Sequence, residues 1–236
     1  MKNKILIMNR TAINSGLMQS LFLLFAVSCF VNCLEVQATT CCNSAGKRDN
    51  WDSGSSVLMV EENTKYKVGD FAQGGIVFWV DETGSRGLVC AIEDQSPGTR
   101  WAYRFIDTHV FGDGLFAGKE NTAKIIAAQT AAGDYDIEYA ARMCDELVIT
   151  VDGIAYDDWY LPSRTEVNLM WQNRYVINRT AVSNGGSAFE SDGLYWSSNE
   201  CNDNLAWIQL FYSINQHYYF KSDRARVRAI RAFNLR

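Results

Sequence analysis

The sequence contains little histidine, since His109 and His217 are the only two in 236 residues. It contains no His-Glu-x-x-His motif and no Gly-x-Ser-x-Gly motif, so the residue sets of zinc hydrolases and serine hydrolases are missing. No Cys-x-x-Cys pair or His/Cys spacing typical of zinc ligands occurs either. These absences predict a protein that is not an enzyme, with no catalytic residues, no metal site and no cofactor.

Basic residues are in the minority, and no Gly-x-y repeat is present. The chain has 22 Lys and Arg against 27 Asp and Glu, a formal net charge of −5. Binding to nucleic acid depends on a basic surface that neutralises phosphates, so we predict no nucleic-acid partner. Without the Gly-x-y repeat, trimerisation through a collagen-like stalk is excluded.

The first 38 residues have the pattern of a secretory signal. Lys2, Lys4 and Arg10 precede an apolar run over 17–27, and small residues flank Gln37. We predict a signal peptide over 1–38, cleaved after Ala38, and an exported protein that is secreted, periplasmic or on the cell surface. Cleavage would remove three basic residues and one acidic residue, leaving 19 against 26 and a net charge of −7.

Two other fates of this segment stay open. Ala26-Val-Ser-Cys29 resembles a lipobox, so a lipid on Cys29 is one alternative, and it is the only membrane attachment we expect of a processed chain. An uncleaved anchor is the other, although Ser28 and Asn32 interrupt a short apolar run.

The cysteines remaining after cleavage are odd in number, so at least one stays unpaired within the chain. They are Cys41, Cys42, Cys90, Cys144 and Cys201. An oxidising compartment permits disulfides. Cys90 lies in an apolar run and Cys144 in a helix-like stretch, which favours buried core positions for both.

The remaining sequence divides into a polar arm or linker over 39–64 and one folded domain over 65–236. Two β-rich runs joined by a Gly-bearing turn open the domain, three helical stretches follow, and strands return at the end. The predicted strands are 74–81, 87–92, 194–198, 206–212, 217–221 and 227–233; the predicted helices are 121–132, 137–147 and 164–173. This order predicts an α+β fold with antiparallel strands.

Two helix starts carry capping signals. Ser163 and Glu166 have the S-x-x-E spacing of a capping box at the start of the helix over 164–173. Asp134 and Asp136 are candidates to cap the helix over 137–147. The adjacent Asp157 and Asp158 face opposite sides of an extended segment, so we interpret them as structural rather than catalytic.

A set of ordered motifs from Tyr66 to Phe233 resembles a known bacterial family. It resembles the Lcl C-terminal domain family, which includes the C-terminal domain of the Legionella collagen-like adhesin and the Fibrobacter major paralogous domain. The motifs are Tyr66-x-Val-Gly-Asp-x-x-x-Gly-Gly-Ile-Val-Phe-Trp-Val-Asp81, Gly87-Leu-Val, Asp94-Gln-Ser96, Asn121-Thr122, Ala140-Ala-x-x-Cys144, Asp158-Trp-Tyr-Leu-Pro-Ser163, Tyr195-Trp-Ser-Ser198, Ala206-Trp207 and Val227-Arg-Ala-x-Arg-Ala-Phe233.

The resemblance implies a C-type-lectin-like fold, in which the N- and C-terminal strands lie close together and helices flank the sheet. It also implies that Asp158 to Ser163 forms a structural corner before a scaffold helix, and that ligands include sulfated glycans. The Glu-Pro-Asn-like loop and Trp-Asn-Asp-like strand of calcium-dependent lectins are absent. Formylglycine-generating oxidases share the broad fold, but they use a cysteine pair that nothing in this sequence brings together.

We place the ligand site between Asn199 and Lys221, where amides and aromatics gather near the last strands. The predicted ligand is a glycan, sulfated glycans included, or a protein at the cell exterior. Alternatives are a structural cell-surface module without a ligand pocket and, less favoured, a formylglycine-generating-like enzyme. The predicted ligand-binding residues are Asn199, Asn202, Asn204, Gln216, His217, Tyr218 and Lys221.

Two neighbouring features receive structural interpretations. Trp207, within the Ala-Trp motif, is predicted to lie in the core. Arg224, Arg226 and Arg228 alternate, so on a strand they would share one face. We expect these guanidinium groups to pair with scaffold carboxylates, with an anion site as the alternative.

Overall fold

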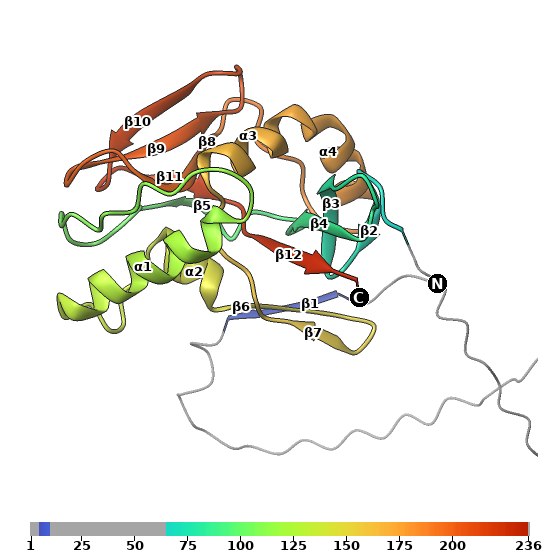
Figure 1. Cartoon of the computed structure of the whole chain (residues 1–236), viewed down its shortest axis with the longest axis horizontal. Helices are drawn as coiled ribbons and strands as arrows, with labels where there is room; N and C mark the ends of the chain where they lie inside the picture. The colour runs from blue at the N-terminus through green and yellow to red at the C-terminus, as the bar shows by residue number, and fades with distance from the viewer. Residues whose placement is uncertain (1–4, 10–64, 236) are drawn as a thin grey trace, which may run out of the picture. The chain divides into compact units, whose positions relative to one another are not determined.

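The computed structural model describes residues 5–9 and 65–235. A four-stranded antiparallel sheet contains β2 (Phe71–Ala72), β3 (Gly75–Val80), β4 (Arg86–Cys90) and β12 (Ile230–Asn234), in the order β12-β4-β3-β2. The predicted hairpin is therefore β3–β4, and Asp81 holds its turn by accepting the Thr83 hydroxyl at 2.8 Å. The last strand of the domain, β12, therefore lies in the same sheet as β2, β3 and β4, the strands with which the domain opens (Figure 1).

A five-stranded sheet contains the outer hairpin that carries the candidate site. Its order is β10-β9-β8-β11-β5, and all its pairings are antiparallel except β8 with β11. The strands are β5 (Ser96–Thr99), β8 (Leu194–Glu200), β9 (Leu205–Leu210), β10 (Gln216–Phe220) and β11 (Ala225–Val227). The run predicted as one strand over 227–233 is two strands, because the chain leaves β11 for the other sheet at Arg228 and Ala229.

A third sheet joins β1 (Ile5–Asn9), β6 (Leu147–Val151) and β7 (Ile154–Tyr156) in the order β1-β6-β7. β1 lies within the segment predicted as a signal peptide and pairs antiparallel with β6, Ile5 opposite Val151 and Asn9 opposite Leu147. The rest of that segment, and the predicted arm over 39–64, lie outside the described residues.

Within the described residues, four helices flank the sheets: α1 (Ala117–Ala131), α2 (Ala140–Asp145), α3 (Arg164–Gln172) and α4 (Arg174–Ser183) (Figure 1). α3 packs on β8 and β9, α4 on β3, and α1 on β8. None of the helices in the described ranges has the length and hydrophobicity that a membrane span requires.

The α3 capping box is confirmed, since the Ser163 hydroxyl accepts the Glu166 amide and Glu166 accepts the Ser163 amide. The second predicted helix was too long: α2 ends at Asp145, and Leu147 begins β6. The predicted caps were wrong as well, because Tyr139 is the N-cap residue and no side chain caps the helix. Asp134 instead accepts Arg104 Nε at 3.1 Å.

Two buried clusters form the core. One gathers aromatic and small side chains around Trp101, Trp159 and Trp196; the other lies between β3–β4 and the helices α3 and α4. Cys90 and Cys144 are fully buried, as predicted, and burial raises the pKa of Cys90 to about 12. The architecture confirms an α+β fold with antiparallel sheets and flanking helices.

Candidate ligand-binding surface

The β9–β10 hairpin is regular, and its register sets which side chains share a face. Gln216 lies opposite Gln209, Tyr218 opposite Trp207 and Phe220 opposite Leu205. Because side chains alternate across a strand, these residues share the face against which α3 packs. The face therefore carries Trp207 and Tyr218 as neighbours at mid-strand.

Trp207 and Tyr218 form the centre of an aromatic surface. Their ring centroids lie 6.0 Å apart in an edge-to-face arrangement. The Arg164 guanidinium carbon lies 3.8 Å from the Trp207 ring centroid. We call Trp207, Tyr218, Arg164 and Gln216 the hairpin surface.

Gln216 fixes Arg164 in place by two hydrogen bonds. Arg164 Nε donates to Gln216 Oε1 at 3.2 Å, and Gln216 Nε2 donates to the Arg164 carbonyl at 2.8 Å. An arginine held this way stacks on the indole without losing further rotamer freedom when a ligand arrives. The hairpin surface is thus preorganised, with an aromatic body and polar groups beside it.

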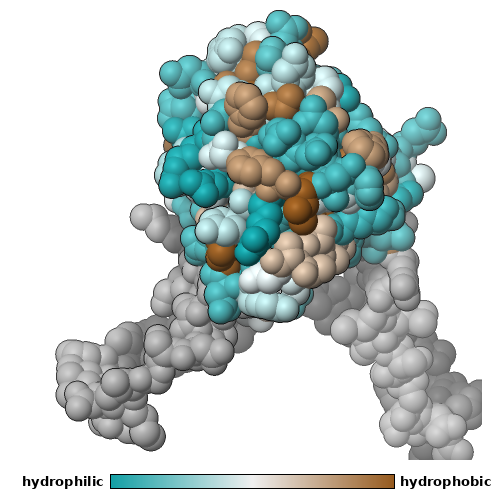
Figure 2. All heavy atoms as spheres, turned by 90° about the vertical axis from the view of Figure 1, so that its left-hand side faces the viewer, coloured by the Kyte–Doolittle hydropathy of each residue, from teal (hydrophilic) through white to brown (hydrophobic). Residues whose placement is uncertain are grey.

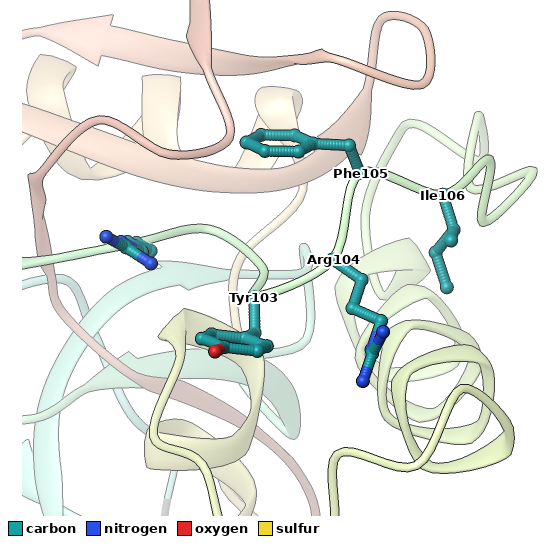
Figure 3. Close-up of a pocket in the computed structure, with 5 residues that line it drawn as sticks. Tyr103, Arg104, Phe105 and Ile106 are labelled. Atoms are coloured by element: carbon teal, nitrogen blue, oxygen red, sulfur yellow. The ribbon is translucent and has the colours of Figure 1, made fainter.

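A shallow hollow lies at the end of the molecule where β10 finishes. It encloses about 530 Å³ and is lined by Arg100, Tyr103, Arg104, Phe105 and Ile106. The Phe105 ring lies apart from the Tyr103 ring, and the Tyr103 and Arg104 side chains both point downward in the view (Figure 3). Both rings are exposed. Figure 2 shows this end of the molecule, where apolar side chains lie among hydrophilic ones.

A buried ion pair connects this hollow to the hairpin. The side chains of Lys221 and Glu200 are both 0% exposed and in direct contact. Lys221 also donates to the Ile106 carbonyl at 2.8 Å, and Glu200 accepts the Thr108 amide at 2.9 Å. Burial lowers the pKa of Lys221, and the hydrogen bond that Lys221 donates to Glu200 opposes that shift. The pair holds the segment that carries Phe105 against the sheet.

Two of the predicted ligand-binding residues are placed inside the protein. Lys221 is in the buried pair described above, so it does not reach a surface ligand. Asn199 is also buried: its Oδ1 accepts the Arg164 amide at 2.8 Å, and its Nδ2 donates to the Gly112 carbonyl at 2.8 Å. We correct both to scaffold residues, because all their polar groups serve internal contacts.

The other predicted residues lie on or near the surface. Asn202 is exposed, but its Oδ1 accepts the Asn204 and Leu205 amides and stabilises the turn before β9. Asn204 is exposed beside it. His217 and Tyr218 are exposed, and Gln216 is half-buried in the hairpin surface. Trp207, predicted as core, is half-buried beneath Arg164 instead.

The arginine stripe and the aspartate pair have structural partners. Arg228 Nε donates to Asp94 at 2.7 Å, and Arg226 bonds Asp94 at 3.2 Å and Glu190 at 3.4 Å. Asp158 pairs with Arg231. Within residues 5–9 and 65–235, no group of three or more His, Cys, Asp or Glu could hold a metal ion.

Sequence reasoning missed Arg164 and the hollow. Arg164 belongs to α3 and meets the hairpin only through tertiary packing, so no local pattern marks it. Tyr103 and Phe105 give only a weak signal, because a single sequence does not distinguish an exposed aromatic residue in a loop from an aromatic residue in the core.

A second hollow of about 240 Å³ lies beside the hairpin turn, with Tyr175 of α4 and Tyr212 among its walls.

No protein-family model matches the chain, and no curated protein matches it. The chemistry of these surfaces is therefore argued from their geometry alone.

Proposed function

We propose that this chain is an exported, non-enzymatic domain that binds a glycan through the hairpin surface. The observation that carries the proposal is the stacked Arg164–Trp207–Tyr218 arrangement, with Gln216 beside it on the outermost hairpin. Sugar rings have apolar faces and hydroxyl rims, which suit an aromatic ring flanked by amide and guanidinium donors.

The fold is consistent with membership of the Lcl C-terminal domain family and with a C-type-lectin-like arrangement. The last strand, β12, pairs with β4 of the opening hairpin, which supports closely placed terminal strands. The corner from Asp158 to Ser163 leads directly into α3, as the resemblance implies. The exposed side chains of the hairpin and of the hollow can vary, whereas Trp101 and Ala102, in the segment that lines the hollow, belong to a buried cluster.

Sulfated glycans are the favoured class of ligand. Arg164 lies on the hairpin surface, and Arg100 and Arg104 line the hollow at the end of β10. Arg104 is ion-paired to Asp134, whereas Arg100 is exposed. A sulfate gains charge-assisted hydrogen bonds from such guanidinium groups, and added salt should weaken them over a Debye length of about 10 Å at 0.1 M.

A glycan array with the full chain, followed by titration of the glycans that bind, tests this proposal. Trp207→Ala should weaken binding by at least about 1 kcal/mol, the scale of a residue that carries interface energy. Tyr135→Ala is the matched control, because Tyr135 is 68% exposed between α1 and α2 and lines neither the hairpin surface nor the two hollows. Unchanged affinity for Trp207→Ala, with a normal melting curve, would sink the assignment; binding to no glycan would favour the structural-module alternative.

A further inference from the structure

Strand β10 is an open edge. Within the described residues it pairs only with β9, and it lies at the outside of its sheet (Figure 1). The strand reads Gln216-His-Tyr-Tyr-Phe220 and contains no Lys, Pro, Asp or Glu. Natural edge strands usually carry such residues or a bulge, which prevent pairing with another chain. This one has an unbroken register and exposes 47% of Tyr218 and 58% of Phe220.

The backbone of β10 has a definite outward side. The Leu210 amide donates to the Asn215 carbonyl at one end of the hairpin, and the Lys221 amide donates to the Asn204 carbonyl at the other. Hydrogen-bonding direction alternates along a regular antiparallel strand. Because both flanking residues face β9, the amides and carbonyls of Gln216, Tyr218 and Phe220 point away from it.

We propose that β10 pairs antiparallel with β10 of a second copy of this chain, about a two-fold axis through Tyr218. This arrangement sets Tyr218 against Tyr218 of the second copy, and Gln216 against its Phe220. In each facing pair the outward amides and carbonyls meet, as in a hydrogen-bonded antiparallel pair. An isologous contact of this kind closes on itself and gives a dimer rather than a fibre.

The charges beside the strand favour this antiparallel arrangement. Arg164 bonds Gln216 at one end of β10, and the Asp223 amide bonds the Phe220 carbonyl at the other. Antiparallel pairing places the Arg164 end of one copy beside the Phe220 end of the other, so the two Arg164 side chains lie apart. A parallel arrangement would bring Arg164 toward Arg164, which is repulsive.

Two groups partly cover the edge. The His217 ring Nδ1 lies 2.8 Å from the Tyr218 carbonyl oxygen, and the Asp223 amide donates to the Phe220 carbonyl at 2.8 Å. A carbonyl has two lone pairs, so these oxygens can also accept the Tyr218 and Gln216 amides of a second copy. The aromatic side chains of the strand remain on the sheet faces, so two hairpin surfaces would join across the axis. The pairing does not depend on glycan binding.

Sedimentation of the full chain over a concentration series, under reducing conditions, tests the proposal. The unmodified chain should pass from monomer to dimer. Tyr218→Lys should raise the dissociation constant at least about tenfold, because two like charges then meet at the axis. Tyr175→Lys, at an exposed tyrosine on α4, should leave the dissociation constant unchanged. A chain that stays monomeric, or a dimer indifferent to Tyr218→Lys, overturns the proposal.

Disulfide trapping tests the register itself. Directly opposite residues in a hydrogen-bonded antiparallel pair have Cα atoms about 5.5 Å apart, within the range that a disulfide spans. Tyr218→Cys should therefore give a cross-linked dimer on mild oxidation, with a 218–218 peptide identified by mass spectrometry. Tyr175→Cys carries the same background cysteines and should give no 175–175 peptide. Equal cross-linking of the two variants would overturn the register.

Discussion

Ser163 and Glu166 connect two helix starts through side-chain hydrogen bonds. The Glu166 carboxylate accepts the Ser163 amide at 2.8 Å and the Phe116 amide, just before α1, at 2.7 Å. The Ser163 hydroxyl donates to the Gly114 carbonyl at 2.7 Å. Burial raises the pKa of Glu166, and the amide donors from Ser163 and Phe116 oppose that shift. The local capping box is thus also a tertiary contact.

We expect Ser163→Ala to lower the free energy of unfolding by about 1 kcal/mol, because it removes the acceptor for the Glu166 amide. Denaturant unfolding of both proteins measures this difference. Glycan affinity should stay unchanged, since the hydroxyl is buried. Unaltered stability together with lost glycan binding would mean that this corner is a ligand site.

At the residue scale, local signals were predictable and tertiary partners were not. The capping box, the buried Cys90 and the buried Cys144 all follow from neighbours within a few residues. Lys221 looked like a surface cation because nothing nearby in sequence pairs with it. Its partners, Glu200 and the Ile106 carbonyl, come from segments that only the fold brings together.

At the element scale, the Lys221–Glu200 pair determines how the loop before α1 lies on the sheet. We expect Lys221→Met to destabilise the protein by roughly 3–5 kcal/mol, because it leaves a buried carboxylate without its cation. Amide exchange at Thr108, measured by NMR or mass spectrometry, should accelerate. Adding Glu200→Gln should restore much of the stability, since the amide oxygen still accepts from Thr108. A double variant no more stable than Lys221→Met would contradict this account.

Most strands with strong β-branched and aromatic patterns were predicted. The short or polar ones were missed, and so was β6, whose run Leu-Val-Ile-Thr-Val begins at the end of the helix predicted over 137–147. β3, β4, β8, β9 and β10 correspond to the predicted runs. β5 (Ser-Pro-Gly-Thr) has no strand pattern, and the predicted second helix absorbed the first residue of β6. α4 was missed because only Ile177 and Ala181 are buried on it, too few to give a clear period.

For the whole molecule, the third sheet and the predicted processing are linked. β6 pairs on one side with β7 and on the other with β1, which lies in the predicted signal peptide. Cleavage after Ala38 would remove β1 and leave β6 (Leu147–Val151) as an edge strand. About half of the backbone amides and carbonyls of β6 would then lose their hydrogen-bond partners in β1. The four- and five-stranded sheets, and the hairpin surface, do not involve β1.

Because cleavage is predicted after Ala38, N-terminal sequencing of the exported protein should give Thr39 as the first residue. Hydrogen exchange should then be faster at alternate amides of Leu147–Val151 in the processed chain than in the full chain, because those amides lose their β1 acceptors. The amides of β9 and β3 serve as internal controls and should exchange alike in both forms. A diacylglyceryl-modified Cys29 would replace cleavage after Ala38 with the lipoprotein alternative, which also removes β1. A mature protein that begins at Met1 would keep β1 paired, so its β6 amides should stay protected; that outcome would contradict cleavage after Ala38 and leave the uncleaved anchor.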